Sequence, residues 1–268
     1  VMAQQNLART YSADLSQSVR AGQASARTSH DLALFGSVDV PIGQAFDLSV
    51  GGRLLRGTVE DVIDMPAGRF AASTSKIALT PAITLAWRRD SNDSIYLRGS
   101  TGFRQGGLTQ GTGGVFKTDG DELRSVELGW RHQTPGLVLE ANLHHGQWRD
   151  IQSDVLLANG QIVTRNIGDA NLNGLNMRAE IALSEGWAVS GGVYLLATQF
   201  DTIQAGDGDT PLPFAAPVQG RIQISKEAQW GKWRGTVQGD LSYVGSRDFF
   251  IRSETSSRLA PLSQFGAS

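Results

Sequence analysis

The sequence predicts an all-β protein, an antiparallel up-and-down β-barrel that crosses a membrane. Apolar and polar residues alternate with a period of two through most of the 268 residues, which is the signature of strands with one buried face. The alternating runs last ten to thirteen residues, longer than the usual five or six of soluble strands and suited to the roughly 9–11 residues of a tilted membrane strand. No run of about 18 apolar residues encodes a membrane-spanning helix.

The first two expected strands show the pattern. In LALFGSVDVPIGQAFDLSVGGRLL (32–55), apolar residues alternate with polar ones on both sides of the turn PIGQ. The same reading along the chain gives ten strands and the start of another. They are expected at 31–41, 45–56, 77–88, 95–104, 123–132, 137–148, 172–183, 187–198, 218–227 and 232–244, with a further strand near Pro261.

The connections between these strands alternate in length. Short turns are expected at 41–44, 89–94, 132–136, 184–186 and 228–232. Long loops are expected at 57–76, 105–122, 149–171, 199–217 and 245–260. The repeating unit is therefore a long hairpin, and a propeller blade, which needs four strands, fits less well. Short turns at one end and long loops at the other are typical of outer-membrane barrels, with the turns periplasmic and the loops extracellular.

On each expected strand the apolar residues fall on one face, and no charged residue interrupts their run; we call this face the apolar face. On 77–88 it carries Ile77, Leu79, Pro81, Ile83, Leu85 and Trp87. The opposite, polar face carries small residues and charges. Its charged and amide residues include Arg53, Arg98, Arg104, Glu127, Glu140, Asn142, Arg178, Glu180, Arg221, Arg234, Gln238 and Asp240.

Alternation alone does not say which face points inward, because a soluble barrel or sandwich would bury the apolar face. The apolar face is rich in glycine and alanine, which fill a sandwich core poorly but are harmless against lipid. A lysine or arginine on a lipid-facing position costs about 2–4 kcal/mol at the bilayer midplane. We therefore expect the apolar face to contact lipid.

Five of the six tryptophans lie at or beside the expected short turns. Indole rings favour the membrane–water interface, where the ring meets lipid and the N–H meets polar groups. The sequence therefore predicts an aromatic girdle at the turn end. Its members are Trp87, Trp130, Trp187, Trp230 and Trp233, with Phe46 and Tyr96.

The two ends of the chain fit the barrel less well. Residues 1–30 are expected to form a polar loop or lead segment, with a short helix over 6–26 as the alternative, and 31–268 the barrel segment. The start lacks the features of a signal peptide, and the end stops where a strand opens. We therefore expect a piece of a longer protein.

Composition and motifs exclude several kinds of chemistry. The net charge of −2 does not favour a nucleic-acid partner, and the absence of cysteine excludes disulfides and thiolate metal sites. Ser73 and Lys76 match S-x-x-K, but the partner motifs of serine acyl enzymes are missing and the segment falls in an expected loop. We predict neither an enzyme nor a cofactor.

Candidate metal sites are equally weak. Adjacent strand residues point to opposite faces, so His144 and His145 are not expected to share an ion. The loop carboxylates of 119–122 and 207–209 lack the full spacing of a calcium loop, and we expect them to form turns. No metal site is predicted.

Three segments resemble the TonB-dependent outer-membrane receptors. SIYLRGSTGFRQGG (94–107) is similar to the family's strand that enters a G-F-[RK]-P-G-G loop, with Gln105 in place of the usual proline. DELRSVELGWRHQTPGLVLEANLHHGQWRDIQ (121–152) resembles the hairpin that follows. NIGDANLNGLNMRAEIAL (166–183) resembles a strand opening, although Asn176 and Arg178 replace a common acidic pair. The resemblance covers most of the chain from about residue 31.

The resemblance implies a part of a 22-stranded barrel, of which this chain supplies about eleven strands, without the plug domain. It implies a receptor in the cell outer membrane that captures a scarce solute, such as an iron–siderophore chelate. Its partners would be outer-membrane lipid, the cargo, and TonB, which contacts a segment that is not in this chain. The alternatives are a passive porin-like channel and a soluble all-β binding module.

Five residues are candidates for contact with cargo. They are expected on the polar face or near the long loops, and arginine and aromatic side chains suit an anionic or aromatic metal chelate. They are Arg104, His144, Trp148, Arg149 and Tyr194. The alternative for the mid-strand charges Arg98, Glu127, Glu140, Arg178 and Glu180 is a lattice of ion pairs between neighbouring strands.

Overall fold

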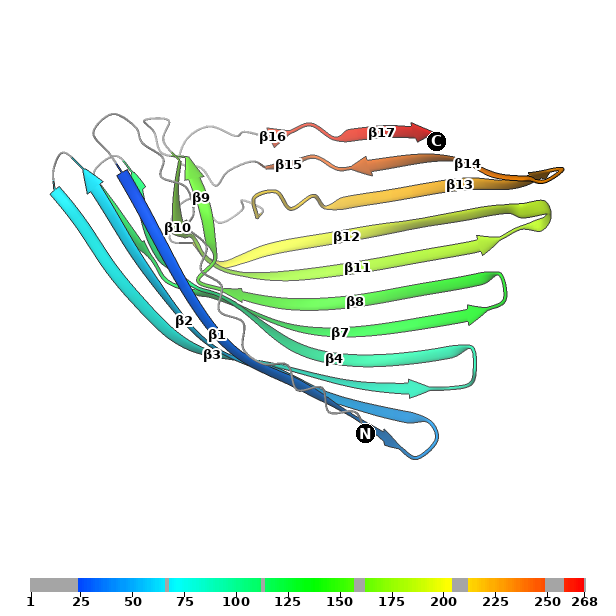
Figure 1. The fold of residues 1–268 in the computed structure, drawn as a ribbon, viewed down its shortest axis with the longest axis horizontal. Coiled ribbons are helices and arrows are strands. Elements are labelled where there is room, and N and C mark those ends of the chain that lie inside the picture. Colours follow the sequence, from blue (N-terminus) through cyan, green and yellow to red (C-terminus); the bar gives the residue numbers. More distant parts are fainter. Residues whose placement is uncertain are drawn as a thin grey trace.

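The computed structural model describes residues 24–65, 68–111, 114–156, 162–203, 212–248 and 258–267. Eleven strands form one curved antiparallel sheet, in the order β1-β2-β3-β4-β7-β8-β11-β12-β13-β14-β17 (Figure 1). The sheet does not close, because β1 and β17 form its two edges. The architecture is the open part of an up-and-down barrel, as the sequence predicts.

The strands of this sheet are 12–21 residues long, apart from the six-residue β17. They are β1 (Ala24–Ile42), β2 (Phe46–Met65), β3 (Gly68–Arg88), β4 (Asp93–Arg104), β7 (Asp121–Thr134), β8 (Leu137–Arg149), β11 (Gly168–Ala182), β12 (Trp187–Ile203), β13 (Val218–Trp230), β14 (Trp233–Val244) and β17 (Leu262–Ala267).

All the expected strands are confirmed, and each expected short turn joins two neighbouring strands. We call the end of the sheet that carries these short turns the turn end and the opposite end the loop end. The one helical segment among the described residues is the 3-10 turn η1 (Ser184–Gly186). No described helix has the length and hydropathy needed to cross a membrane.

One expected loop is wrong. Residues 57–65 and 68–76 continue β2 and β3 as a paired hairpin, so the Ser73–Lys76 motif lies in a strand. The reason is an inversion of the alternation. Beyond Leu54 the apolar face becomes polar, whereas Val59 and Ile63 on the opposite face are buried at 6% and 3% exposure. A strand that leaves a membrane but remains covered by loops on its other side would show this inversion.

The N-terminal edge also differs from expectation. β1 begins at Ala24 rather than at 31, so residues 24–30 are strand and pair with β2. The helix or loop expected over 6–26 lies mainly outside the described residues. The division of the chain at residue 30 therefore stays a prediction.

The register shows that the strands are tilted. A row of directly paired residues starts at Phe46 at the turn end of β2, passes through Trp87, Ile95 and Trp130, and reaches Tyr243 near the loop end of β14. Such a climb across the sheet is the stagger that a barrel requires, because its strands tilt about 35–45° from the axis. The sheet therefore has the shear of a barrel wall.

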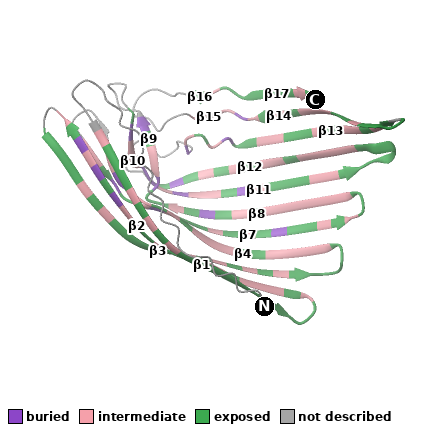
Figure 2. Cartoon of the chain, viewed as in Figure 1, coloured by how far each residue is buried: buried purple, intermediate pink, exposed green. Residues whose placement is uncertain are grey.

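The apolar face is largely uncovered. Leu85, Ile181 and Val237 are 41%, 38% and 62% exposed, and no second sheet stacks on them among the described residues. Figure 2 shows exposed and intermediate residues along the main strands, with buried ones gathered towards the loop end. A sandwich core is therefore excluded.

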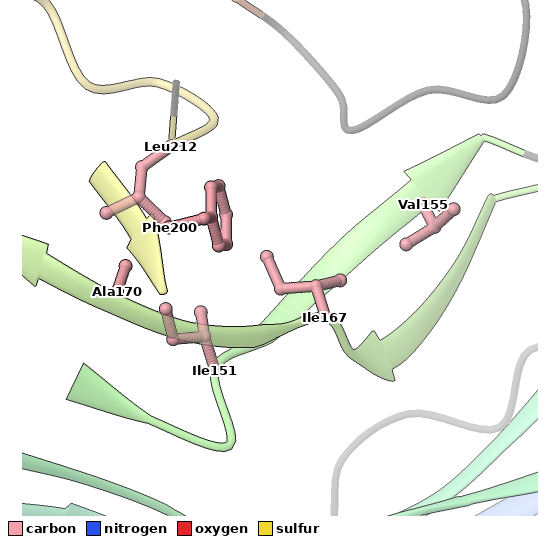
Figure 3. Close-up of a cluster of buried hydrophobic side chains, with 6 residues drawn as sticks. All are labelled: Ile151, Val155, Ile167, Ala170, Phe200 and Leu212. Carbon is pink, nitrogen blue, oxygen red and sulfur yellow. The ribbon is translucent and has the colours of Figure 1, made fainter. Parts of the chain in front are cut away.

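Three short hairpins extend from the loop end. The first is β5 (Gly107–Gly111) with β6 (Gly114–Thr118), the second β9 (Gln152–Leu156) with β10 (Ile162–Asn166), and the third β15 (Arg247–Asp248) with β16 (Arg258–Leu259). The expected loops 105–122 and 149–171 thus contain strands of their own. A small hydrophobic cluster joins the β9–β10 hairpin to the loop ends of β11 and β12 (Figure 3): Ile151, Val155, Ile167, Ala170, Phe200 and Leu212.

The aromatic girdle holds for most of its members. Phe46, Trp87, Trp130, Trp187 and Trp233 are 38–73% exposed, and Trp130 donates its indole N–H to Asp93 at 3.1 Å. Tyr96 does not belong to the girdle, because its parity in β4 is that of Arg98 and its hydroxyl bonds Glu127. Aromatic type and closeness to a turn suggested the girdle, but the period of two places Tyr96 on the polar face.

Candidate functional site on the polar face

Two of the five predicted cargo residues meet in the structure. The His144 and Tyr194 rings are stacked, with 5.7 Å between centroids and 7° between planes. The Tyr194 hydroxyl lies 3.2 Å from Nε2 of His144. Gly174 of β11 is the cross-strand partner of His144 of β8, and a Cβ atom at Gly174 would overlap the imidazole ring. The bare glycine therefore lets the imidazole lie flat across β11 and reach β12.

A hydrogen-bonded group adjoins this pair. The Tyr96 ring covers Gly129, and its hydroxyl bonds Glu127 and accepts from Nδ2 of Asn142 at 2.9 Å. Together with His144, Tyr194 and Asn176, these residues line a polar-face cavity of about 560 Å³. The cavity presents flat rings and amides, which suit stacking and hydrogen bonding, beside the charged side chains of Glu127, Arg131 and Glu140.

Arg104 is fixed by the protein itself. Its Nε donates to Asp121 at 3.0 Å, and its guanidinium also donates to the carbonyl of Gln152 at 2.7 Å. Asp121 is only 3% exposed and also accepts from the backbone N–H of Gln152 at 3.2 Å. Arg104 therefore ties β4 and β7 to the β9–β10 hairpin.

The other two predicted residues lie apart from the aromatic pair. Trp148 packs against the hydrophobic cluster under the loops. Arg149 follows it in β8 with the opposite parity, and lines a small cavity of about 250 Å³ with Asp169 and Asp201. The structure thus divides the five candidates among an aromatic pair, an ion pair, a hydrophobic cluster and an outer rim.

The polar-face charges form fewer cross-strand pairs than expected. Glu140 pairs with Arg131 of β7 at 3.4 Å, but Arg178 bonds Glu180 two residues along its own strand. Glu127 bonds Tyr96 instead of an arginine. A pair that was not expected joins Arg221 and Asp240 at 3.3 Å across β13 and β14. The lattice is therefore real but partial.

The weak metal candidates that lie in the described part of the chain are separated from one another. His145 bonds Asn173 on the apolar-face side, whereas His144 bonds Tyr194 on the polar face, as adjacent strand residues must. Asp119 pairs with Lys117 at 3.5 Å. Among the described residues no three histidine, cysteine or acidic side chains converge. The 207–209 carboxylates lie outside the described residues.

The sequence reading missed a second ion pair at the loop end. Arg27 donates to Asp61 at 2.6 and 3.2 Å, and Asp61 also accepts from the backbone N–H of Leu108 at 2.6 Å. Arg27 in turn donates to the Leu108 carbonyl at 3.0 Å. This group, which we call the Asp61 latch, holds the β5–β6 hairpin on β1 and β2. The only sign of this group in the sequence is the pattern V-x-D-x-I in 59–63, which places Asp61 on the same strand face as Val59 and Ile63.

A curved sheet with barrel shear, short turns and layered loop hairpins agrees with the comparisons with known proteins. The family model described as "TonB dependent receptor-like, beta-barrel" matches residues 3–266. The chain belongs to this family. Its resemblance to TonB-dependent receptors in the sequence is therefore confirmed, whereas a comparison with curated protein sequences gives no match.

Solved structures of ferric-chelate receptors and transporters have the same fold. The ferric yersiniabactin uptake receptor FyuA from Yersinia pestis aligns over 91% of this chain and 38% of its own, with a TM-score of 0.75 and 14% identity. The ferric-catecholate import receptor Fiu from E. coli K12 aligns over 93% and 39%, with a TM-score of 0.71 and 15% identity. The ferric citrate transporter FecA aligns over 94% and 39%, with a TM-score of 0.68 and 16% identity. The chain spans about two fifths of the length of these receptors.

Proposed function

We propose that this chain is part of the wall of an outer-membrane receptor that imports a scarce solute, most simply an iron–siderophore-like chelate, with energy delivered through TonB. The observation that carries the proposal is the family match over nearly the whole chain. The apolar face then contacts outer-membrane lipid, the turn end is periplasmic and the loop end extracellular. The plug and the TonB-contacting segment are assigned to other parts of the complete receptor.

Within this wall, we assign cargo contact first to His144 and Tyr194. Their stacked rings lie beside Asn142 and Asn176 in the 560 Å³ cavity. An aromatic face and amide donors favour a planar ligand with hydrogen-bond acceptors. Trp148 and Arg104 support the proposal indirectly, because they hold the loop hairpins over the polar face. Arg149 is assigned a contact with cargo at the outer rim of the loop end, beside Asp169 and Asp201.

The test is uptake by the complete gene product. A strain that lacks it should lose growth on one ferric chelate from a panel under iron limitation, and the intact gene should restore growth. Restoration should require a functional TonB, because the proposed import depends on the energy that TonB delivers. Passive diffusion through a channel would not require TonB. Growth that is restored equally without TonB would instead identify a porin-like channel.

The site assignment has its own test. Replacing both rings, as His144→Ala with Tyr194→Ala, should weaken binding of the same chelate by about thirtyfold, since each of the two lost ring contacts contributes on the order of 1 kcal/mol. Gln238→Ala is the matched control, because Gln238 lies on the polar face of β14 away from the cavity. Equal binding by both variants would remove His144 and Tyr194 from the site.

A further inference from the structure

The apolar face carries a hollow that the proposed function does not use. It has a volume of about 680 Å³ and lies across four neighbouring strands, β7, β8, β11 and β12. Its walls are the apolar-face side chains of Val126, Leu128, Leu143, Leu175 and Leu195. All of these except Leu175 are 38–56% exposed.

The hollow ends at a sharp boundary between apolar and polar rows. Leu128, Leu143, Leu175 and Leu195 are direct cross-strand neighbours and form an unbroken row. The next row towards the loop end holds His145 and Asn173, whose side chains hydrogen-bond at 2.9 Å. Both also line the hollow. A hydrocarbon chain in the hollow would therefore meet these two polar side chains at its loop-end terminus.

The His145–Asn173 pair offers one donor and one acceptor to a ligand. If Nδ1 of His145 donates to Oδ1 of Asn173, then Nε2 is free to accept and the Asn173 amide is free to donate. If the amide is rotated and donates to Nδ1, then Nε2–H donates and the amide oxygen accepts. Among the described residues these side chains make no other hydrogen bond. Either arrangement complements a group that has both a C=O and an N–H.

The charges nearby argue against recognition of a phosphate. Arg124 lies one row further towards the loop end, paired across the sheet with Gln147. Its Nε is held by Glu122 at 2.5 Å. The rim beyond carries the carboxylates of Asp169 and Asp201 beside Arg149. The polar end of the hollow is therefore neutral to acidic, and a neutral linkage suits it better than an anionic headgroup.

We propose that this hollow binds the acyl chain of an amide-linked membrane lipid. The chain runs along the strand direction and crosses the leucine row, and the amide C=O and N–H at its loop-end terminus pair with Asn173 and His145. An ester-linked chain would satisfy only the donor and leave the acceptor without a partner. The proposal rests on the membrane location of the proposed function, because the hollow is continuous with the lipid-facing surface.

The test compares two single-chain probes that differ in one group, N-palmitoylethanolamine and ethylene glycol monopalmitate. The complete gene product, extracted from membranes and exchanged into detergent, is incubated with both, and bound probe is counted by native mass spectrometry. The amide probe should be retained about fivefold more than the ester, which corresponds to about one hydrogen bond. His145→Leu with Asn173→Leu should make retention of the two probes equal.

Two further variants separate shape from hydrogen bonding. Ala197→Phe fills the hollow and should lower retention of both probes, whereas Val237→Phe, on the apolar face of β14 outside the hollow, should change neither. Equal retention of the probes by the unaltered protein, or a preference that survives His145→Leu with Asn173→Leu, would overturn the lipid site alone. Absence of the protein from the membrane fraction would instead overturn the proposed function.

Discussion

The two faces of the sheet are built from the same strands but are stabilised in different ways. The apolar face has few directed contacts, and many of its side chains are exposed, as at Leu143 (56%) and Val237 (62%). The polar face is held by specific groups such as the Asp61 latch and the Arg104–Asp121 pair. A substitution on the apolar face should therefore change stability through solvation. A substitution on the polar face should change it through the geometry of these hydrogen bonds and ion pairs.

The largest effect is expected from a charge on the apolar face. Val237→Arg should lower the free energy of unfolding in lipid vesicles by about 2–4 kcal/mol, because Val237 is near the middle of β14 on the exposed face that we propose contacts lipid. Gln238→Arg, the next residue on the polar face, is the control and should cost little. Denaturant titration of the complete gene product measures both. Equal costs would erase the distinction between the faces.

The next effect concerns the Asp61 latch. Asp61→Ala leaves the backbone N–H of Leu108 without its acceptor and should cost about 1–3 kcal/mol. The loss of stability should be local. Amide hydrogen exchange should therefore rise in 107–118 before it rises in the main strands. Asp64→Ala removes an exposed pair with Arg69 at 3.8 Å and should cost less than about 1 kcal/mol. Unchanged exchange in Asp61→Ala would show that other contacts hold the β5–β6 hairpin.

A smaller effect is expected at the aromatic pair. Gly174→Ala places a Cβ atom inside the His144 ring, so the ring must swing away from Tyr194. The cost should be about 1 kcal/mol, at the low end for overpacking, because the ring has open space on the polar face. Gly99→Ala is the control, since nothing lies within 4 Å of its added Cβ. Chelate binding should fall in Gly174→Ala and stay constant in Gly99→Ala.

The smallest effect is a pH dependence in the turn between β3 and β4. Hydrogen bonds from the backbone N–H groups of Asn92 and Asp93 lower the pKa of Asp90 below its ordinary value of 3.8. A lowered folded-state pKa stabilises the turn above about pH 3.8 and loses that contribution as pH falls further. Asp90→Asn should therefore flatten the acid side of the stability profile. An unchanged acid limb would show that Asp90 does not contribute.

The alternation predicts this fold well wherever one face of a strand stays apolar over the whole strand, because the period of two is then complete from the short turn to the loop end. It fails at 57–76, where the faces exchange character beyond Leu54 and the strand continues outside the expected membrane band. The assignment of Tyr96 to the girdle was wrong because it followed the nearness of Tyr96 to a turn rather than its parity, which places it on the polar face. Parity, once established, is the more reliable guide.

The site was less predictable than the fold. His144 and Tyr194 were expected on the same face, but only the tertiary register across Gly174 shows that their rings meet. Arg104 was expected to contact cargo, but it bonds the buried Asp121 and the Gln152 carbonyl, which come from other strands. Partners so far apart in sequence leave no mark in the local pattern.

The most direct test of the account is a series of single cysteines along β3, which the cysteine-free chain permits. Spin labels at Ile77, Leu79, Ile83 and Leu85 should be accessible to oxygen in the bilayer, and labels at Ala78, Thr80, Ala82 and Thr84 to a water-soluble nickel complex. The two accessibilities should alternate with a period of two through residues 77–85. High nickel access at the odd positions, or no alternation, would contradict a lipid-facing apolar surface.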